Sequence, residues 1–121
     1  MAERGFLQLC SDRRFHRATM DAFERATGLG PGDYYIEARP GGAPAFSDKT
    51  KSARLAYRDG ARHMGWMAHG DVCRGFYGES DDDLRRRLER TARKRAEDFP
   101  GATHYLIFAL DGDVQVERLQ R

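Results

Sequence analysis

Short apolar segments alternate along the chain with polar stretches that contain glycine. The first segment, "GFLQLC" at residues 5–10, passes directly into polar residues, as expected of a buried strand whose carboxyl end opens into a loop. Aromatic and β-branched residues, or unbroken apolar runs, favour strands in three further segments. These segments are "DYYIEA" at 33–38, "GWMAH" at 65–69 and "THYLIFAL" at 103–110.

Helices are expected between the strands. Thr19 is the predicted N-cap of the first helix, and Gly28 is its predicted stop. A second helix is predicted from Ser47 to Met64, because small and apolar residues recur on one face at helical spacing. The residues of that face are Ala53, Ala56, Tyr57, Gly60, Ala61 and Met64.

The third helix has the clearest boundaries. Ser80, followed three residues later by Asp83, resembles a capping box, and the helix is predicted to run to about Asp98. Further along, the Asp111-Gly112 pair predicts a hairpin between the strand at 103–110 and a last strand in "VQVERLQ". The buried stripe of the third helix is expected to consist of Leu84, Leu88, Ala92 and Ala96.

Alternating strands and helices are typical of a parallel sheet with helices on both faces. We therefore expect an α/β fold: a three-layer sandwich with a mostly parallel sheet in the order 2-1-3-4, plus an antiparallel edge strand. The whole chain, residues 1–121, is predicted to form a single domain. In such sheets ligands bind at the carboxyl ends of the strands, where the strand order reverses.

Composition narrows the class of protein. Of the 121 residues, 40% are hydrophobic, which suffices for one modest core, and 21 basic against 19 acidic side chains leave a formal charge of only +2. The chain has no apolar run near the roughly 20 residues of a membrane span, and "MAERGFLQ" lacks the apolar core of a signal peptide. We therefore expect a soluble, cytoplasmic protein with no membrane partner.

Reactive residue types collect at two predicted strand ends. Cys10, Asp12 and Arg14 occupy alternate positions after the first strand, so an extended segment would point all three the same way. His69 ends the third strand, and Cys73, the only other cysteine, follows it. Because a reducing cytosol disfavours disulfides, the two cysteines are interpreted as buried thiols, reactive thiols or metal ligands.

Three stretches, "CSDRRF", "LGPGDYYIEARPGG" and "HGDVCRG", together resemble the β-class carbonic anhydrases, which are zinc enzymes that interconvert carbon dioxide and bicarbonate. That family has a C-x-D-x-R motif, which is intact here as Cys10, Asp12 and Arg14. Its second stretch is matched by Gly32, Asp33, Arg39 and Gly42.

The resemblance implies a lyase with Zn²⁺ as cofactor and Cys10, His69 and Cys73 as the metal ligands. It also implies catalytic roles for Asp12, which would orient the nucleophile, and for Arg14, which would keep Asp12 ionised. Zinc lowers the pKa of bound water to about 7, which suits hydration of carbon dioxide or of carbonyl sulfide or carbon disulfide. A homodimer or higher homo-oligomer is the implied assembly.

One departure from the family motif keeps a second interpretation open. Three residues separate His69 from Cys73, where the family has two, and Gly70 is expected to let the extra residue bulge. Asp12 either becomes a fourth ligand that closes the zinc site or pairs with Arg14 and leaves that position to water. The alternative function is therefore a catalytically silent zinc-binding or assembly module.

The densest basic run, "RRRLERTARKR" at 85–95, lies on the third predicted helix. Its charged residues fall opposite the apolar stripe, as expected of a solvated face. No aromatic residues are interleaved with these charges, so nucleic acid is not an expected partner. The charged face is expected to comprise Arg86, Arg87, Arg90, Arg93 and Lys94.

Overall fold

The computed structural model describes residues 3–71 and 73–120 of the chain. Strands and helices alternate along it, with two single turns of 3-10 helix placed before α2 and before α3. The elements are β1 (Arg4–Cys10), α1 (His16–Thr27), β2 (Tyr34–Arg39), η1 (Ala43–Ala45), α2 (Lys51–Arg58), β3 (Ala61–His69), η2 (Arg74–Phe76), α3 (Asp81–Asp98), β4 (Thr103–Leu110) and β5 (Asp113–Arg118).

The strands form one sheet in the order β2-β1-β3-β4-β5, which confirms the predicted order and fold class. The first four strands run parallel, and β5 pairs antiparallel with β4. Asp111 and Gly112 make the turn between β4 and β5, both with positive φ (53° and 76°), as a tight hairpin turn requires. The hairpin prediction is therefore confirmed.

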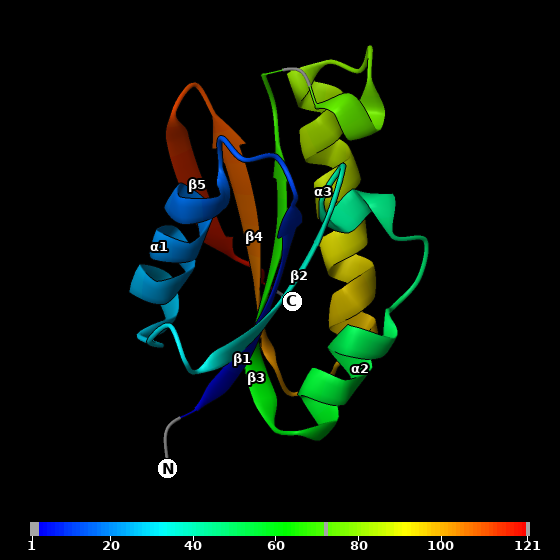
Figure 1. The fold of residues 1–121 in the computed structure, drawn as a ribbon. Helices are drawn as coiled ribbons and strands as arrows, with labels where there is room; N and C mark the ends of the chain where they lie inside the picture. Colours follow the sequence, from blue (N-terminus) through cyan, green and yellow to red (C-terminus); the bar gives the residue numbers. More distant parts are fainter. Residues whose placement is uncertain (1–2, 72, 121) are drawn as a thin grey trace.

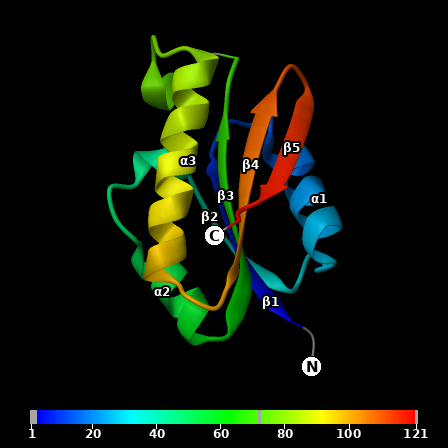
Figure 2. The same cartoon turned by 180° about the vertical axis from the view of Figure 1, so that it is seen from behind.

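Helices cover both faces of this sheet (Figure 1). Helix α1 packs on one face, beside β5, whereas α2 and α3 pack on the other, as the reverse view also shows (Figure 2). The chain therefore leaves β1 toward one face and β3 toward the opposite face. Because β1 and β3 are neighbours, their carboxyl ends border the crevice that such a change of direction creates.

The core lies on both sides of β1, β3 and β4. Strands buried on both faces are nearly continuous in apolar residues, which explains why β1 and β4 were recognisable as short apolar runs. Helix α1 contributes Phe23, which packs against Gly65 of β3, where a Cβ would lie 2.9 Å from the ring. Among the fully buried large side chains are Trp66, Phe6, Phe23, Phe108, Leu7, Met64 and Met67.

Helix α1 begins earlier than its sequence predicts. Its N-cap is Phe15, which makes no side-chain capping bond, and Thr19 lies inside the first turns with its side chain fully buried. The aromatic ring of Phe15 packs against His69, so tertiary packing rather than a capping hydroxyl sets the start. The predicted end is correct: Gly28 is the C-cap, with φ 78°.

The predicted second helix is too long at both ends. Thr50 caps α2 by accepting a hydrogen bond from the Ala53 amide, and α2 ends at Arg58. Gly60 adopts φ 102°, and β3 starts at Ala61 rather than near Gly65. Small buried residues at the start of a strand matched helical spacing by coincidence, so periodicity alone could not separate the two elements.

The third helix agrees with its predicted boundaries. The Ser80 hydroxyl accepts a hydrogen bond from the Asp83 amide at 3.1 Å, and the helix runs to Asp98. In the buried stripe, however, Arg95 rather than Ala96 is the fully buried residue of the last turns.

The basic face of α3 is exposed as predicted, except for half-buried Arg87. Several of its arginines pair with acidic residues of the same region: Arg86 with Asp83 and Arg93 with Glu89. None of the helices in residues 3–71 and 73–120 combines the length and the hydropathy of a membrane-spanning segment.

Candidate metal centre

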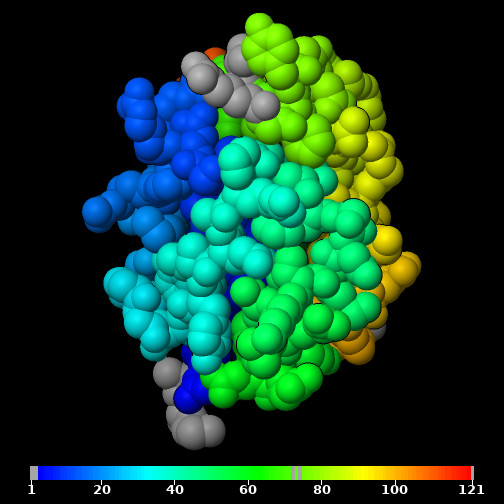
Figure 3. Space-filling model, turned by 45° about the vertical axis from the view of Figure 1, so that its right-hand side comes forward, coloured from blue at the N-terminus to red at the C-terminus, as the bar shows by residue number. Residues whose placement is uncertain are grey.

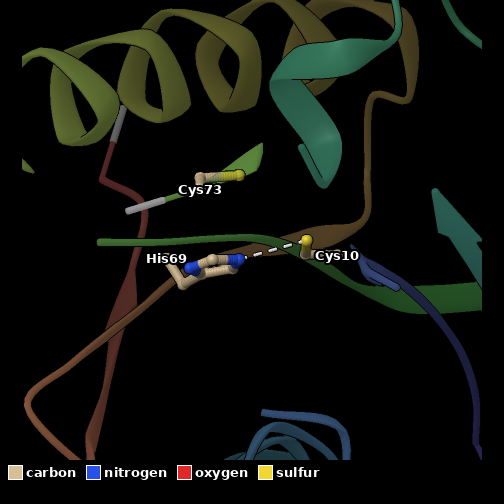
Figure 4. Close-up of side chains that lie close together, drawn as sticks. All are labelled: Cys10, His69 and Cys73. Atoms are coloured by element: carbon tan, nitrogen blue, oxygen red, sulfur yellow. Dashed lines mark hydrogen bonds between the residues drawn. The ribbon is translucent and has the colours of Figure 1, made fainter. Parts of the chain in front are cut away.

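The end of the sheet where the parallel strands finish brings together three possible metal ligands, Cys10, His69 and Cys73 (Figure 4). Cys10 is the last residue of β1 and His69 the last of β3, so parallel pairing brings both to the same edge. Cys73 follows four residues after His69. One donor atom from each residue lies within 4.8 Å of the other two, and the residues are only 3%, 1% and 2% exposed, respectively.

The ring of His69 is oriented from two sides. Its Nδ1 lies 2.6 Å from the carbonyl oxygen of Gly70, so Nδ1 carries the proton and donates it. The other ring nitrogen, Nε2, faces the Cys10 sulfur at 3.2 Å and shares a proton with it. Phe15 stacks on the opposite side of the imidazole, with ring centroids 4.4 Å apart. Both contacts leave Nε2 as the nitrogen able to bind a metal.

The sulfur of Cys10 lies in a pocket of hydrogen-bond donors. The Gly41 amide donates to it at 3.4 Å, and the Asp12 amide also stabilises its thiolate. A hydrogen bond from Cys73 contributes most to lowering the pKa of the Cys10 thiol, and His69 adds to this, against the opposing effect of burial. These contacts therefore favour the thiolate form of Cys10.

Cys73 has the opposite tendency. The same hydrogen bond with Cys10, together with burial, raises the pKa of the Cys73 thiol. The backbone amides of Gly75 and Phe76 partly offset this, because they too stabilise a thiolate at this position. Backbone N–H groups thus donate hydrogen bonds to both sulfurs. This arrangement suits two anionic ligands around one cation.

The donor set fits a tetrahedral ion. With metal–sulfur bonds of about 2.3 Å and metal–nitrogen bonds of about 2.0 Å, tetrahedral ligand atoms lie roughly 3.5 to 3.8 Å apart. The 3.2 Å between His69 Nε2 and Cys10 Sγ, and the 4.8 Å limit for all three atoms, require only small shifts to reach those separations. The three residues could therefore hold a metal ion, as predicted from the strand ends.

Asp12 and Arg14 lie beside the cluster and form a fork-like pair. Arg14 Nε lies 3.0 and 3.2 Å from the two carboxylate oxygens, and Nη2 lies 2.8 Å from Oδ2. This pairing is the main reason that the pKa of Asp12 lies well below its usual range. Asp12 Oδ2 is also 3.7 Å from His69 Nε2, so the carboxylate borders the space between the three donors.

The glycine-rich loop after β2 forms one wall of the centre. Gly42 adopts φ 70° and ψ −151°, and a Cβ there would lie 2.2 Å from the carbonyl oxygen of Met67 and 3.3 Å from the Cys10 nitrogen. Phe76 packs over Gly41, where a Cβ would be 2.9 Å from its ring. Tyr77, by contrast, points outward and is 83% exposed.

The residues of the family-like second stretch divide between the two ends of β2. Arg39 and Gly42 lie near the cluster, and Arg39 also stacks over the Phe46 ring at 4.8 Å. Gly32 and Asp33 lie at the opposite end, where the Asp33 carboxylate accepts a hydrogen bond from the Gly30 amide. Only the first pair therefore belongs to the candidate site.

Gly70 and Asp71 follow His69 in the segment that leads to Cys73. Gly70 does not have a positive φ; the left-handed conformation occurs at Asp71, with φ 56°. Gly70 is required for space instead, because a Cβ there would lie 2.5 Å from Asp81 Oδ1 and 2.6 Å from Leu110 Cδ1. The expectation that Gly70 lets the extra residue bulge stays a prediction, and the structure shows that a side chain at this position would not fit.

Sequence reasoning also missed the supporting residues of the centre. Phe15 was hidden in a polar stretch, and the roles of the Gly41 amide and of Asp71 depend on segments that come together only in the fold.

In comparisons with protein-family models and with curated protein sequences, no match to this chain was found. What this chain does must therefore be inferred from its own residues.

Proposed function

We propose that this protein binds Zn²⁺ through Cys10, His69 and Cys73 and hydrates carbon dioxide, or a close analogue such as carbonyl sulfide or carbon disulfide. The observation that carries the proposal is the buried convergence of these three donors next to the Asp12–Arg14 pair. Two thiolates and one imidazole are ligands typical of zinc. A zinc ion bound there would act as a Lewis acid that makes water nucleophilic near neutral pH.

Asp12 is suited to orient the attacking water. Its carboxylate stays ionised, because Arg14 lowers its pKa, and it therefore accepts hydrogen bonds without donating one. Arg14 holds both carboxylate oxygens, which fixes the direction in which Asp12 accepts. Proximity and fixed orientation of this kind lower the barrier of the attack on carbon.

Burial favours a small, uncharged substrate. The three donor residues are almost fully enclosed, and Phe15 covers one side of His69. A bulky or strongly hydrated substrate would have to displace more of these packed side chains than carbon dioxide would. Water exclusion on the Phe15 side also strengthens the electrostatic effect of the neighbouring charges.

The proposal is tested by metal content and by hydration kinetics on the same preparation. We expect one zinc per chain by elemental analysis and stopped-flow hydration of carbon dioxide between pH 6 and 9. Cys10→Ser and His69→Gln should lose both. His63→Gln is the matched control, because His63 lies away from the cluster and bonds Glu3 and Tyr105.

The second candidate is a catalytically silent zinc-binding or assembly module. The 3.7 Å between Asp12 Oδ2 and His69 Nε2 favours it, because a small movement would make Asp12 a fourth ligand and close the site to water. Zinc at one per chain with no hydration at any pH from 6 to 9 would support this module and reject the lyase. Absence of zinc binding would reject both.

We also propose that two copies associate through β2. This strand is an edge of the sheet and exposes Tyr35 and Ile36, which are 46% and 50% accessible. The segment, cyan in Figure 3, lies at the molecular surface, and an open strand edge with apolar side chains favours pairing with another strand. Light scattering should give a dimer, and Ile36→Lys should give a monomer; a monomeric wild type would reject the pairing.

A further inference from the structure

We propose that Asp71 is a positioning residue of the metal centre, which holds the Gly70 peptide that orients His69 and the Arg14 side chain that orients Asp12. This inference rests on the proposed metal site and goes beyond its ligand set. The hydrogen bonds of Asp71 go to Asp81, Asp111 and Arg14, so its effect on the donor atoms is transmitted by the Gly70 peptide and by Arg14.

The backbone of Asp71 is in an unusual conformation for a residue with a side chain. Its φ is 56°, in the left-handed region, which aspartate and asparagine adopt more readily than other non-glycine residues. Such a conformation persists only where the surroundings impose it. Asp71 lies between His69 and Cys73, which three residues separate here and two separate in the β-class carbonic anhydrases.

Three groups of Asp71 are tied to three different parts of the fold. Its amide donates to Asp81 Oδ1 at 3.0 Å, at the start of α3. Its Oδ2 accepts from the Asp111 amide at 2.6 Å, in the β4–β5 turn. Its carbonyl oxygen lies 3.4 Å from both Nη1 and Nη2 of Arg14. Backbone and side chain are therefore both held.

These contacts connect Asp71 to the donor atoms by two routes. Gly70, the preceding residue, donates its amide to the Ala109 carbonyl at 2.8 Å and accepts from His69 Nδ1 with its own carbonyl. The orientation of that carbonyl depends on the peptide unit it shares with Asp71. On the other side, Arg14 binds both the Asp71 carbonyl and the Asp12 carboxylate, so it links the two loops that border the cluster.

The residue type makes a graded series of variants possible. Asparagine keeps the tolerance for positive φ and an oxygen that accepts from Asp111, and it removes only the charge. Glycine keeps the φ and loses the side-chain acceptor. Alanine loses both. If Asp71 acts through conformation and through its bond to the β4–β5 turn, zinc affinity must fall in the order Asp71→Asn, Asp71→Gly, Asp71→Ala.

The experiment measures zinc affinity by competition with a chromophoric chelator, at a temperature well below the unfolding transition of every metal-free variant. We expect Asp71→Asn within about threefold of wild type, Asp71→Gly about tenfold weaker and Asp71→Ala up to about 100-fold weaker, the range found when groups that orient metal ligands are removed. Asp82→Ala is the control, an exposed acidic residue in the first turn of α3, and should bind as wild type.

A spectroscopic readout separates positioning from simple loss of stability. Cobalt(II) in place of zinc reports ligand geometry, so the visible absorption bands of Asp71→Ala should shift or weaken, and those of Asp71→Asn should match wild type. Equal affinity and equal cobalt spectra for wild type and Asp71→Ala would overturn the inference, as would Asp71→Asn behaving like Asp71→Ala. A wild-type protein that binds no metal would instead reject the proposed function.

Discussion

His69 Nε2 and Cys10 Sγ lie 3.2 Å apart and share a hydrogen bond between two side chains that are almost completely buried. The bond joins residues 59 positions apart in the sequence, at the ends of the neighbouring strands β1 and β3. Each atom is placed to bind the same cation. A metal ion must therefore replace the protons that these residues hold between them.

Zinc affinity should rise with pH as a consequence. The pKa of Cys73 is raised by its hydrogen bond with Cys10 and by burial, so this thiol is protonated at neutral pH and must lose its proton when it binds a metal. Each proton released makes the apparent affinity rise tenfold per pH unit. We expect at least a tenfold rise per unit between pH 6 and 8, with proton release measured by calorimetry in buffers of different ionisation enthalpy.

His63→Gln should retain this pH dependence, because His63 contacts Glu3 and Tyr105 rather than the cluster. A zinc affinity that stays constant from pH 6 to 8 would show that Cys73 keeps its proton when zinc binds. Cys73 would then not be a zinc ligand.

Replacing Arg14 by glutamine should raise the pKa of Asp12 toward about 3.9, because the guanidinium is the main cause of its depression. A depressed pKa stabilises the fold above the unfolded value, and this stabilisation is lost as the pH falls through the folded value. Arg14→Gln should therefore be less stable than wild type at pH 7, and this difference in the free energy of unfolding should shrink as the solution becomes acidic. Carbon-detected NMR titration of Asp12 measures the shift directly.

Hydration of carbon dioxide at pH 7 to 9 should fall about tenfold or more in Arg14→Gln, because Asp12 loses the group that orients it. Zinc content should not change. Arg13→Gln, an exposed neighbour, is the control. Unaltered kinetics in Arg14→Gln would mean that Asp12 keeps its position without the guanidinium.

The alternation of strands and helices could be predicted from the sequence, because β1 and β4 are buried on both faces and therefore form apolar runs. Element ends were less predictable. Thr19 matched an N-cap by residue type, but Phe15 starts α1 because its ring packs on His69, a contact between residues 54 positions apart. The start of β3 at Ala61 was hidden, since small buried residues fit both a helix face and a strand.

The candidate site was likewise predictable only in part. Cys10 and His69 could be brought together from sequence, because strand ends of a parallel sheet meet at one edge. The position of the left-handed residue could not: Gly70 has the permissive residue type, but Asp71 has the positive φ. Its partners at the start of α3 and in the β4–β5 turn are known only once the sheet is assembled.

Gly42→Ala should severely destabilise the protein. The backbone of Gly42, at φ 70° and ψ −151°, is in a region that is essentially restricted to glycine, and a Cβ would lie 2.2 Å from the Met67 carbonyl oxygen. Because that atom belongs to the central strand β3, it cannot move aside cheaply. We expect a loss of about 3 kcal/mol in the free energy of unfolding, measured by urea denaturation.

Gly101→Ala separates the cost of the backbone conformation from the cost of the steric clash. Gly101 has φ 84°, and a Cβ at this position would have no other atom within 4 Å, so only the backbone cost of about 1 kcal/mol applies. Equal losses in the two variants would show that the close approach of Gly42 to β3 contributes nothing beyond its φ.

Arg95 occupies the buried position of α3 where Ala96 was expected. Its side chain is 3% exposed, and Nη1 contacts Asp98 Oδ2 at 2.5 Å, whereas Asp48 lies 3.5 Å away. Arg95→Ala should cost about 2 kcal/mol of unfolding free energy, since it removes the packed stem and deprives the half-buried Asp98 of its main partner. Lys49, 3.7 Å from Asp98, limits the loss.

Two further variants identify the cause. Arg95→Met keeps an apolar stem in the same place and should recover part of the stability lost in Arg95→Ala, if packing contributes. Arg93→Ala, which removes an exposed pair with Glu89 on the same helix, should cost no more than about 0.5 kcal/mol. If Arg95→Ala is as mild as Arg93→Ala in urea denaturation, then Arg95 does not anchor the end of α3, and its burial makes no net contribution to stability.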